Sequence, residues 1–194
     1  MPLIVLIILG IVVLYIISTY NSMASMRTRI HASIQEIGNQ LKRQAELIPN
    51  LEESAKGYLK HEKEIIKMLA DARKVVMNAV SSGDLGKLSA AGEKVSQLIP
   101  HLRLAVESNP NIKGADVVTK LMDELRDTSD KVMYARRTLI DLSADYNIAL
   151  VTFPSNMIAK MFGFAAEKGL DTPTSGGHLE VSSEEIKTPK VKLE

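Results

Sequence analysis

The chain has no cysteine and no tryptophan, only three phenylalanines, and no charged side chain before Arg27. The lack of cysteine removes thiol nucleophiles and suits a reducing compartment. The formal net charge is +1, with acidic and basic residues interspersed, so there is no basic face for nucleic acid. Ala, Leu, Ile, Met, Lys and Glu dominate the composition, which favours an all-α fold with almost no strand.

The N-terminus is the most apolar part of the chain. Apart from Gly10 and Tyr15, every residue from Leu3 to Ile17 is Leu, Ile or Val. Together these residues favour insertion into a bilayer by on the order of 6 kcal/mol. A helix over residues 3–20 is about 27 Å long, close to the ~30 Å of a hydrocarbon core. We therefore expect residues 1–20 to form a single transmembrane anchor.

A cleaved signal peptide is the alternative, because Ser22-Met23-Ala24 weakly resembles a small-x-small cleavage site. Signal peptides carry a basic region before a shorter apolar stretch, however, and no basic side chain precedes Leu3. Basic residues follow the span instead, at Arg27 and Arg29. The positive-inside rule therefore predicts that the N-terminus lies outside and that residues 21–194 lie in the cytoplasm.

Beyond residue 20, apolar residues recur at steps of three and four, which is the pattern of helices with one buried stripe. The longest such segment runs from near Gly114 to before Pro154, since proline disfavours helix at the residue preceding it. A helix of roughly 60 Å suits a long antiparallel bundle. Its stripe is Val118, Leu121, Leu125, Thr128, Val132, Ala135, Leu139, Leu142, Tyr146, Ala149 and Phe153.

Three further helices are expected upstream, over residues 1–48, 51–81 and 85–107. Pro49-Asn50 marks a turn, Asp84 is the expected N-cap of the third helix, and Pro100 is expected to kink or break that helix. The stripe of the first is Met23, Met26, Ile30, Ile34, Ile37, Leu41, Ala45 and Ile48. That of the second is Ala55, Tyr58, Glu62, Ile65, Leu69, Ala72, Val76 and Ala79.

A short amphipathic segment, Asn156 to Phe164, follows the last long helix. From about Glu167 the sequence has few bulky apolar residues, and we expect a disordered tail. The expected organisation is an anchor, an antiparallel bundle of about four long helices plus a short C-terminal amphipathic helix, and a tail. These parts cover residues 1–20, 21–165 and 166–194.

A series of short motifs extends from the anchor to about residue 165. It comprises Tyr20-Asn21, Gln40–Arg43, Leu47–Leu51, Lys56-Gly57-Tyr58, His61-Glu62, Ala135-Arg136-Arg137, Asp145-Tyr146-Asn147, Phe153–Asn156 and Phe162-Gly163-Phe164. The series resembles the LemA family of bacterial membrane proteins. The resemblance implies one N-terminal membrane helix, a bundle of long helices on the cytoplasmic side of the inner membrane, and no established enzymatic chemistry.

The chain departs from the family pattern in two places. Leu139-Ile140 stands where relatives typically carry Tyr-Asn, and Thr128-Ser129 stands where they typically carry Thr-Glu. Any role of those side chains in relatives is therefore not carried over to this chain.

His61-Glu62 is the closest approach to a catalytic or metal-binding motif. A zincin helix needs a second histidine four residues after the first, and that position is Ile65. Neither a P-loop nor a Ser-His-Asp pattern is recognisable. We therefore expect a protein that is not an enzyme and that has no metal site or cofactor.

Glu62 falls on the apolar stripe of the second helix. A carboxylate buried there without a partner costs several kcal/mol. It is therefore expected either to pair with a base or to lie at the edge of the stripe and reach water. The candidate partners are Arg43, Arg136 and Arg137.

All three phenylalanines, Phe153, Phe162 and Phe164, follow the end of the last long helix. If successive helices alternate in direction, the C-terminal end of the last long helix returns to the bilayer, and Tyr146 lies across from Tyr20. The short amphipathic segment then lies either in the headgroup region or over the open end of the bundle as a hydrophobic plug.

Two functional classes remain open. The first is a membrane-anchored structural protein that binds copies of itself, or other membrane proteins. Its contacts would involve the membrane-proximal halves of the first and last long helices with Phe162-Gly163-Phe164. The second is a ligand-binding or enzymatic bundle that uses His61, Glu62 and a buried arginine. The lack of reactive groups favours the first.

A cysteine introduced at Ser182 tests the expected orientation, because the chain has no other cysteine. We expect membrane-impermeant maleimide to leave this cysteine unlabelled in intact cells and to label it after the cells are permeabilised. Labelling in intact cells would reverse the orientation.

Overall fold

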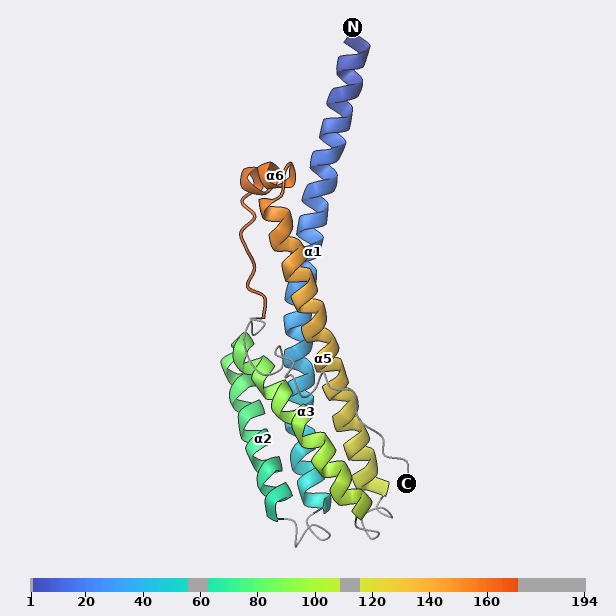
Figure 1. The fold of residues 1–194 in the computed structure, drawn as a ribbon, viewed down its shortest axis with the longest axis vertical. Coiled ribbons are helices and arrows are strands. Elements are labelled where there is room, and N and C mark those ends of the chain that lie inside the picture. The colour runs from blue at the N-terminus through green and yellow to red at the C-terminus, as the bar shows by residue number, and fades with distance from the viewer. Residues whose placement is uncertain (1, 56–62, 109–115, 171–194) are drawn as a thin grey trace, which may run out of the picture.

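The computed structural model describes residues 2–55, 63–108 and 116–170, and every regular element in these ranges is a helix (Figure 1). The helices are α1 (Pro2–Ala55), α2 (Lys63–Ser82), α3 (Leu85–Ser108), α5 (Asp116–Val151) and α6 (Ser155–Phe162). The expected all-α fold is confirmed.

The first helix, α1, continues from the apolar N-terminal run into the bundle without a break (Figure 1). It contains an 18-residue window of mean hydropathy 2.8, none of it buried, and is long and apolar enough to cross a membrane. The first buried side chain along α1 is that of Met23. Contact with the rest of the fold therefore begins a few residues after the apolar run ends.

The expected turn at Pro49-Asn50 is wrong, because α1 continues through Pro49 to Ala55. Pro100 likewise lies inside α3 and does not end it. A proline inside a helix costs about 3 kcal/mol, since it removes a backbone hydrogen bond. Burial compensates here, because the apolar stripe continues on both sides of each proline. The flanking buried residues are Ile48, Leu51, Leu98 and Leu102.

Four helices form an up-and-down bundle in which α1 contacts α2, α2 contacts α3, α3 contacts α5, and α5 returns to α1. The contact between α1 and α5 is the most extensive. With 20 and 24 residues, α2 and α3 are much shorter than α5, which has 36. They therefore cover only the part of the α1–α5 pair that is distant from the apolar run (Figure 1).

The expected stripes account for most of the core. In α2 the buried residues are the predicted Ile65, Leu69, Ala72, Val76 and Ala79. The α5 stripe is buried from Val118 to Tyr146, except that Leu121 is only partly buried. Phe153 is exposed, against expectation, because α5 ends at Val151.

The turn between α2 and α3 follows the predicted cap. Gly83 adopts a φ of +62°, the left-handed conformation that ends many helices. The carboxylate of Asp84 then accepts a hydrogen bond of 2.9 Å from the backbone N–H of Lys87. Asp84 is thus confirmed as the N-cap of α3.

One buried polar residue on α1 was not expected. Gln44 is fully buried, and neither atom of its amide has a hydrogen-bond partner among the described residues. The predicted stripe assigned this part of the core to Ala45, which is only partly buried. Gln44 nevertheless lies three residues after Leu41 and four before Ile48, so the helical spacing itself includes it.

Replacing Gln44 with methionine is expected to raise the free energy of unfolding by about 1–3 kcal/mol, because a near-isosteric apolar side chain removes an unpaired buried amide. Gln97→Met on the exposed face of α3 is the matched control, with an expected change below about 0.5 kcal/mol. Denaturant titration of the detergent-solubilised protein measures both. A loss of stability in Gln44→Met would show that the amide is needed for packing.

Candidate membrane-proximal site

The C-terminal end of α5 carries a short helix that lies across the upper part of the α1–α5 pair (Figure 1). The turn between α5 and α6 is closed by Ser155, whose hydroxyl oxygen lies 2.7 Å from the carbonyl oxygen of Ala149. Ile158 and Ala159 of α6 are buried against the bundle. The predicted amphipathic segment is thus a helix with one side packed on the protein.

Gly163 reverses the chain at the end of α6. Its φ is +71°, and the next backbone N–H, that of Phe164, donates a 2.9 Å hydrogen bond to the carbonyl of Ala159. A left-handed glycine with this bond is a Schellman motif. The chain then descends beside the bundle (Figure 1). We call residues 163–170 the strap.

The reversal brings together aromatic residues from three parts of the chain. The ring of Tyr20 lies 4.9 Å from that of Phe162 and 5.5 Å from that of Phe164, measured between centroids. Phe164 also packs at 6.5 Å against Tyr146. The end of α5 therefore returns to the level of Tyr20, as predicted from helices that alternate in direction.

Two consecutive residues of α5 hold the strap by hydrogen bonds. The hydroxyl of Tyr146 donates to the carbonyl oxygen of Ala165 at 3.0 Å. The amide of Asn147 donates to the carbonyl of Glu167 at 3.0 Å and accepts from its N–H at 3.2 Å. Burial raises the pKa of Tyr146, so its hydroxyl remains a protonated donor at neutral pH.

The side chain of Glu167 connects the strap to α1. Its carboxylate accepts a hydrogen bond from Arg27 Nε at 2.8 Å and lies 3.7 Å from Nε2 of His31. This carboxylate is only 18% exposed, so the ion pair is better shielded than a fully exposed one. The strap thus joins α1 to α5 where α2 and α3 do not reach.

Near Gly169 the strap lies close to the side chain of Ser143 on α5. A Cβ atom at this position would meet the hydroxyl oxygen of Ser143 at 2.5 Å, so any larger residue would displace the strap or Ser143. Residues 166–170, which were expected to begin a disordered tail, instead lie along the bundle. Residues 171–194 are outside the described ranges, and the expectation for them stays a prediction.

The predicted arginines do not converge. Arg43 of α1 pairs with Glu124 of α5, which raises the pKa of Arg43 mainly through the hydrogen bond. Arg136 is partly buried, about 18 Å farther along α5 than Glu124 at 1.5 Å per residue, and Arg137 is exposed. Asn21 is also exposed. His61 and Glu62 lie outside the described residues.

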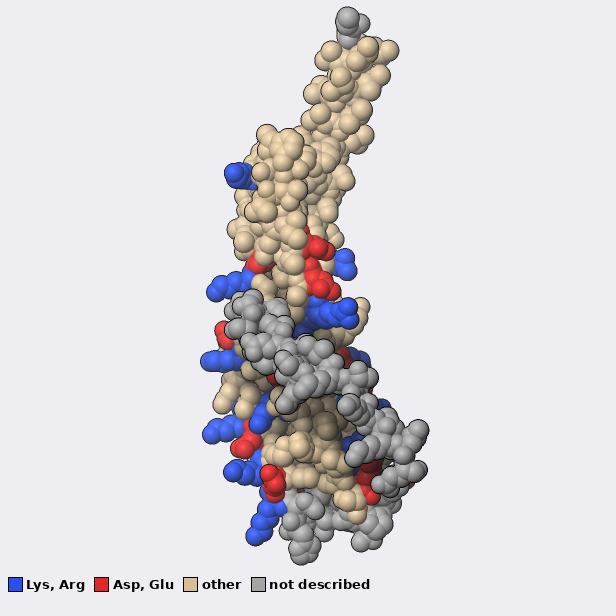
Figure 2. Space-filling model, viewed as in Figure 1, with Lys and Arg blue, Asp and Glu red and all other residues tan. Residues whose placement is uncertain are grey.

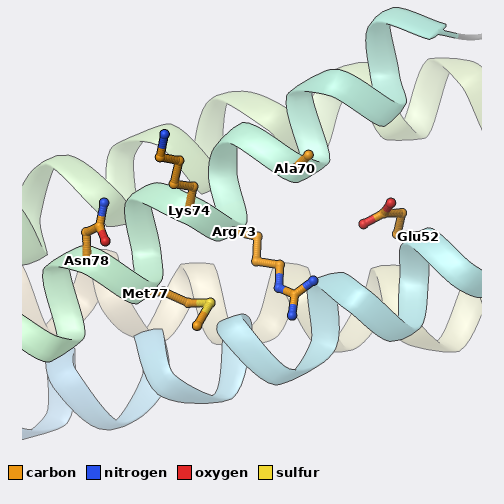
Figure 3. Close-up of a pocket in the computed structure, with 6 residues that line it drawn as sticks. All are labelled: Glu52, Ala70, Arg73, Lys74, Met77 and Asn78. Atoms are coloured by element: carbon orange, nitrogen blue, oxygen red, sulfur yellow. The ribbon is translucent and has the colours of Figure 1, made fainter.

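The described residues contain no group of three or more His, Cys, Asp or Glu side chains that could hold a metal ion. A hollow of about 440 Å³ lies between α1 and α2. Its lining includes Glu52, Arg73 and Lys74, and Figure 3 shows Arg73 extended towards α1 while Lys74 points away. The hollow is open to solvent, and among these described side chains no hydrogen bond or ion pair joins Glu52 to Arg73 or Lys74.

A second hollow, of about 350 Å³, lies between α1 and α5 nearer the apolar run. Small side chains line much of it, namely Ala32, Ser33, Ala135 and Thr138. Tyr134 stands at its rim and is 75% exposed. We call this hollow the α1–α5 groove.

A family model, that of the LemA family, matches residues 33–184 of the chain. The matched region includes Tyr146, Asn147, the Gly163 reversal and Glu167, so it contains both the strap and the α5 residues that hold it. No match is found among curated proteins.

Substitution of Asn147 by alanine is expected to release the strap, because two hydrogen bonds worth about 1–3 kcal/mol together are lost. Amide exchange of residues 164–169, followed by mass spectrometry, should accelerate by one to two orders of magnitude while exchange in α2 stays unchanged. Asn78→Ala, at an exposed position on α2, is the control. Unchanged protection of the strap in Asn147→Ala would contradict the assigned role.

Proposed function

The chain belongs to the LemA family, and from this premise and its geometry we propose that it is a non-enzymatic, membrane-anchored scaffold that associates with copies of itself. The observation that carries the proposal is the unbroken α1. Because the same helix includes the candidate membrane span and one wall of the bundle, each anchored copy presents its α1–α5 pair at a fixed height and orientation. Anchoring in one plane also raises the effective concentration of weakly binding copies.

We place the contact between copies in the α1–α5 groove. Phe162 and Phe164, which were expected to contribute, already pack on Tyr20 of their own chain. The groove lies on the other side of the α1–α5 pair from the strap. Arg29 lines the groove, whereas Arg27 and His31 face Glu167, and residues two apart on a helix point in nearly opposite directions.

Membrane anchoring restricts how two copies can meet. Copies inserted in the same direction can be related only by an axis along the membrane normal, so equivalent residues lie at equal heights. Tyr134 lies at the height of its own groove, because it stands on the groove rim. A two-fold axis therefore places the Tyr134 ring of each copy opposite the small side chains of the other, which gives a self-complementary contact.

The proposed location is the bacterial cytoplasmic membrane, with the N-terminus outside and the bundle in the cytoplasm. Its support is the placement of Arg27 and Arg29 directly after the span, together with family membership. Another membrane protein with a protruding aromatic residue at the same height is the alternative occupant of the groove.

Replacing Tyr134 with serine is expected to reduce the assembly to monomers without a change in the helical content of the bundle, since Tyr134 is exposed within one chain. Met133→Ser, the neighbouring exposed position on α5, is the matched control and should assemble as the wild type does. Mass measurement by light scattering in mild detergent and in lipid discs large enough for several copies reports the result.

A single cysteine at Thr138 should also form crosslinks between copies in native membranes, whereas one at Arg137 should not. Monomeric wild-type protein at micromolar concentration in both media would refute self-association. Crosslinks from Thr138 exclusively to another protein would assign the groove to that protein instead.

A further inference from the structure

We propose that the exposed face of α6 and the turn before it form a lipid-binding surface in the headgroup region of the bilayer that α1 crosses. We call this surface the collar, and define it by Val151, Phe153, Met157, Met161 and Phe162. The proposal rests on anchoring through α1 but not on self-association. It makes the bilayer a second binding partner of the folded domain.

The collar is too apolar for a surface in water. Val151 and Phe153 are each 75% exposed, and Met157 and Met161 are 63% and 62% exposed. On the opposite side of α6, Ile158 and Ala159 are buried, so the helix cannot turn its apolar side chains inwards. Large exposed apolar patches mark binding surfaces. The single basic residue of α6, Lys160, is exposed and is placed to reach lipid phosphates.

The distribution of charge along the chain indicates that the collar binds lipid. No charged residue occurs before Arg27, and Lys160 is the only one between Asp145 and Glu167. These limits coincide in space, because Arg27 and Glu167 form an ion pair and Asn147 binds the Glu167 backbone. In Figure 2, the upper part of the molecule shows no acidic side chain and a single basic one. A zone whose single charged side chain is that of Lys160, and which begins at the candidate membrane-spanning helix, fits a lipid surface.

The height of α6 agrees with this assignment. Phe162 packs on Tyr20, which lies about 4.5 Å along the helix from Ile17, the end of the strongly apolar run. Interfacial helices bury their apolar face about 5–10 Å into the boundary between headgroups and acyl chains. The collar is therefore at the depth that such helices occupy.

Depth-dependent quenching tests the proposal on the full-length protein in lipid discs. A single cysteine is introduced at Met161 and labelled with an environment-sensitive fluorophore, with Met133, exposed on the long shaft of α5, as the matched control. We expect lipids with a nitroxide near the headgroup to quench the Met161 label at least about twofold more than the Met133 label. Aqueous iodide should quench the Met133 label more than the Met161 label.

A label at Leu9 separates failure of the collar from failure of the anchor, because it must be quenched by deep nitroxides whenever α1 spans the bilayer. The proposal would be overturned if iodide quenched the Met161 and Met133 labels equally while deep nitroxides still quenched the Leu9 label. Shielding of Met161 from both quenchers would also overturn it, since protein would then cover the collar. The Tyr134→Ser variant should give the same Met161 result as the wild type, because lipid contact does not require a second copy.

Discussion

The antiparallel packing of α1 against α5 is the contact on which the rest of the structure depends. It is the most extensive contact between elements, and its stripes account for much of the buried apolar surface. Since α2 and α3 are short, they can complete the core only at the end distant from the apolar run. The other end would expose Met23 and Tyr146, and α6 with the strap supplies the missing cover. The membrane-proximal site is thus a consequence of unequal helix lengths.

The strap is held by polar contacts with specific geometry in addition to apolar burial. Tyr146 and Asn147 are successive residues on α5, and both bind the backbone of the strap, so their bonds fix its register as well as its position. Gly163 and Gly169 act at its two ends, where a left-handed turn and a close approach to Ser143 exclude larger side chains. Within the motif Asp145-Tyr146-Asn147, Tyr146 and Asn147 therefore have a structural explanation, which is that they hold the strap.

Helical periodicity predicted the fold well because burial on one face is a local property of the sequence. The α2 stripe and most of the α5 stripe were found in this way. Pro49 misled the prediction, since the local cost of proline is smaller than the burial of Ile48 and Leu51, which depends on partner helices. The strap was not predicted, because Glu167 meets Arg27 only after the reversal at Gly163. The burial of Gln44 could have been predicted, because its spacing from Leu41 and Ile48 places it on the core side of α1.

The absence of a break in α1 connects the bundle mechanically to the apolar run, which is long and apolar enough to cross a membrane. The 54 residues of α1 form a rod of about 80 Å, of which residues 21–55 make up about 50 Å. Transmembrane helices are tilted by about 20° from the bilayer normal on average. A tilt of that size moves the far end of the bundle sideways by roughly 17 Å, by rigid-body geometry along a helix of 1.5 Å rise per residue. Where α1 crosses a bilayer, a change in its tilt is therefore converted into a lateral displacement at the far end of the bundle.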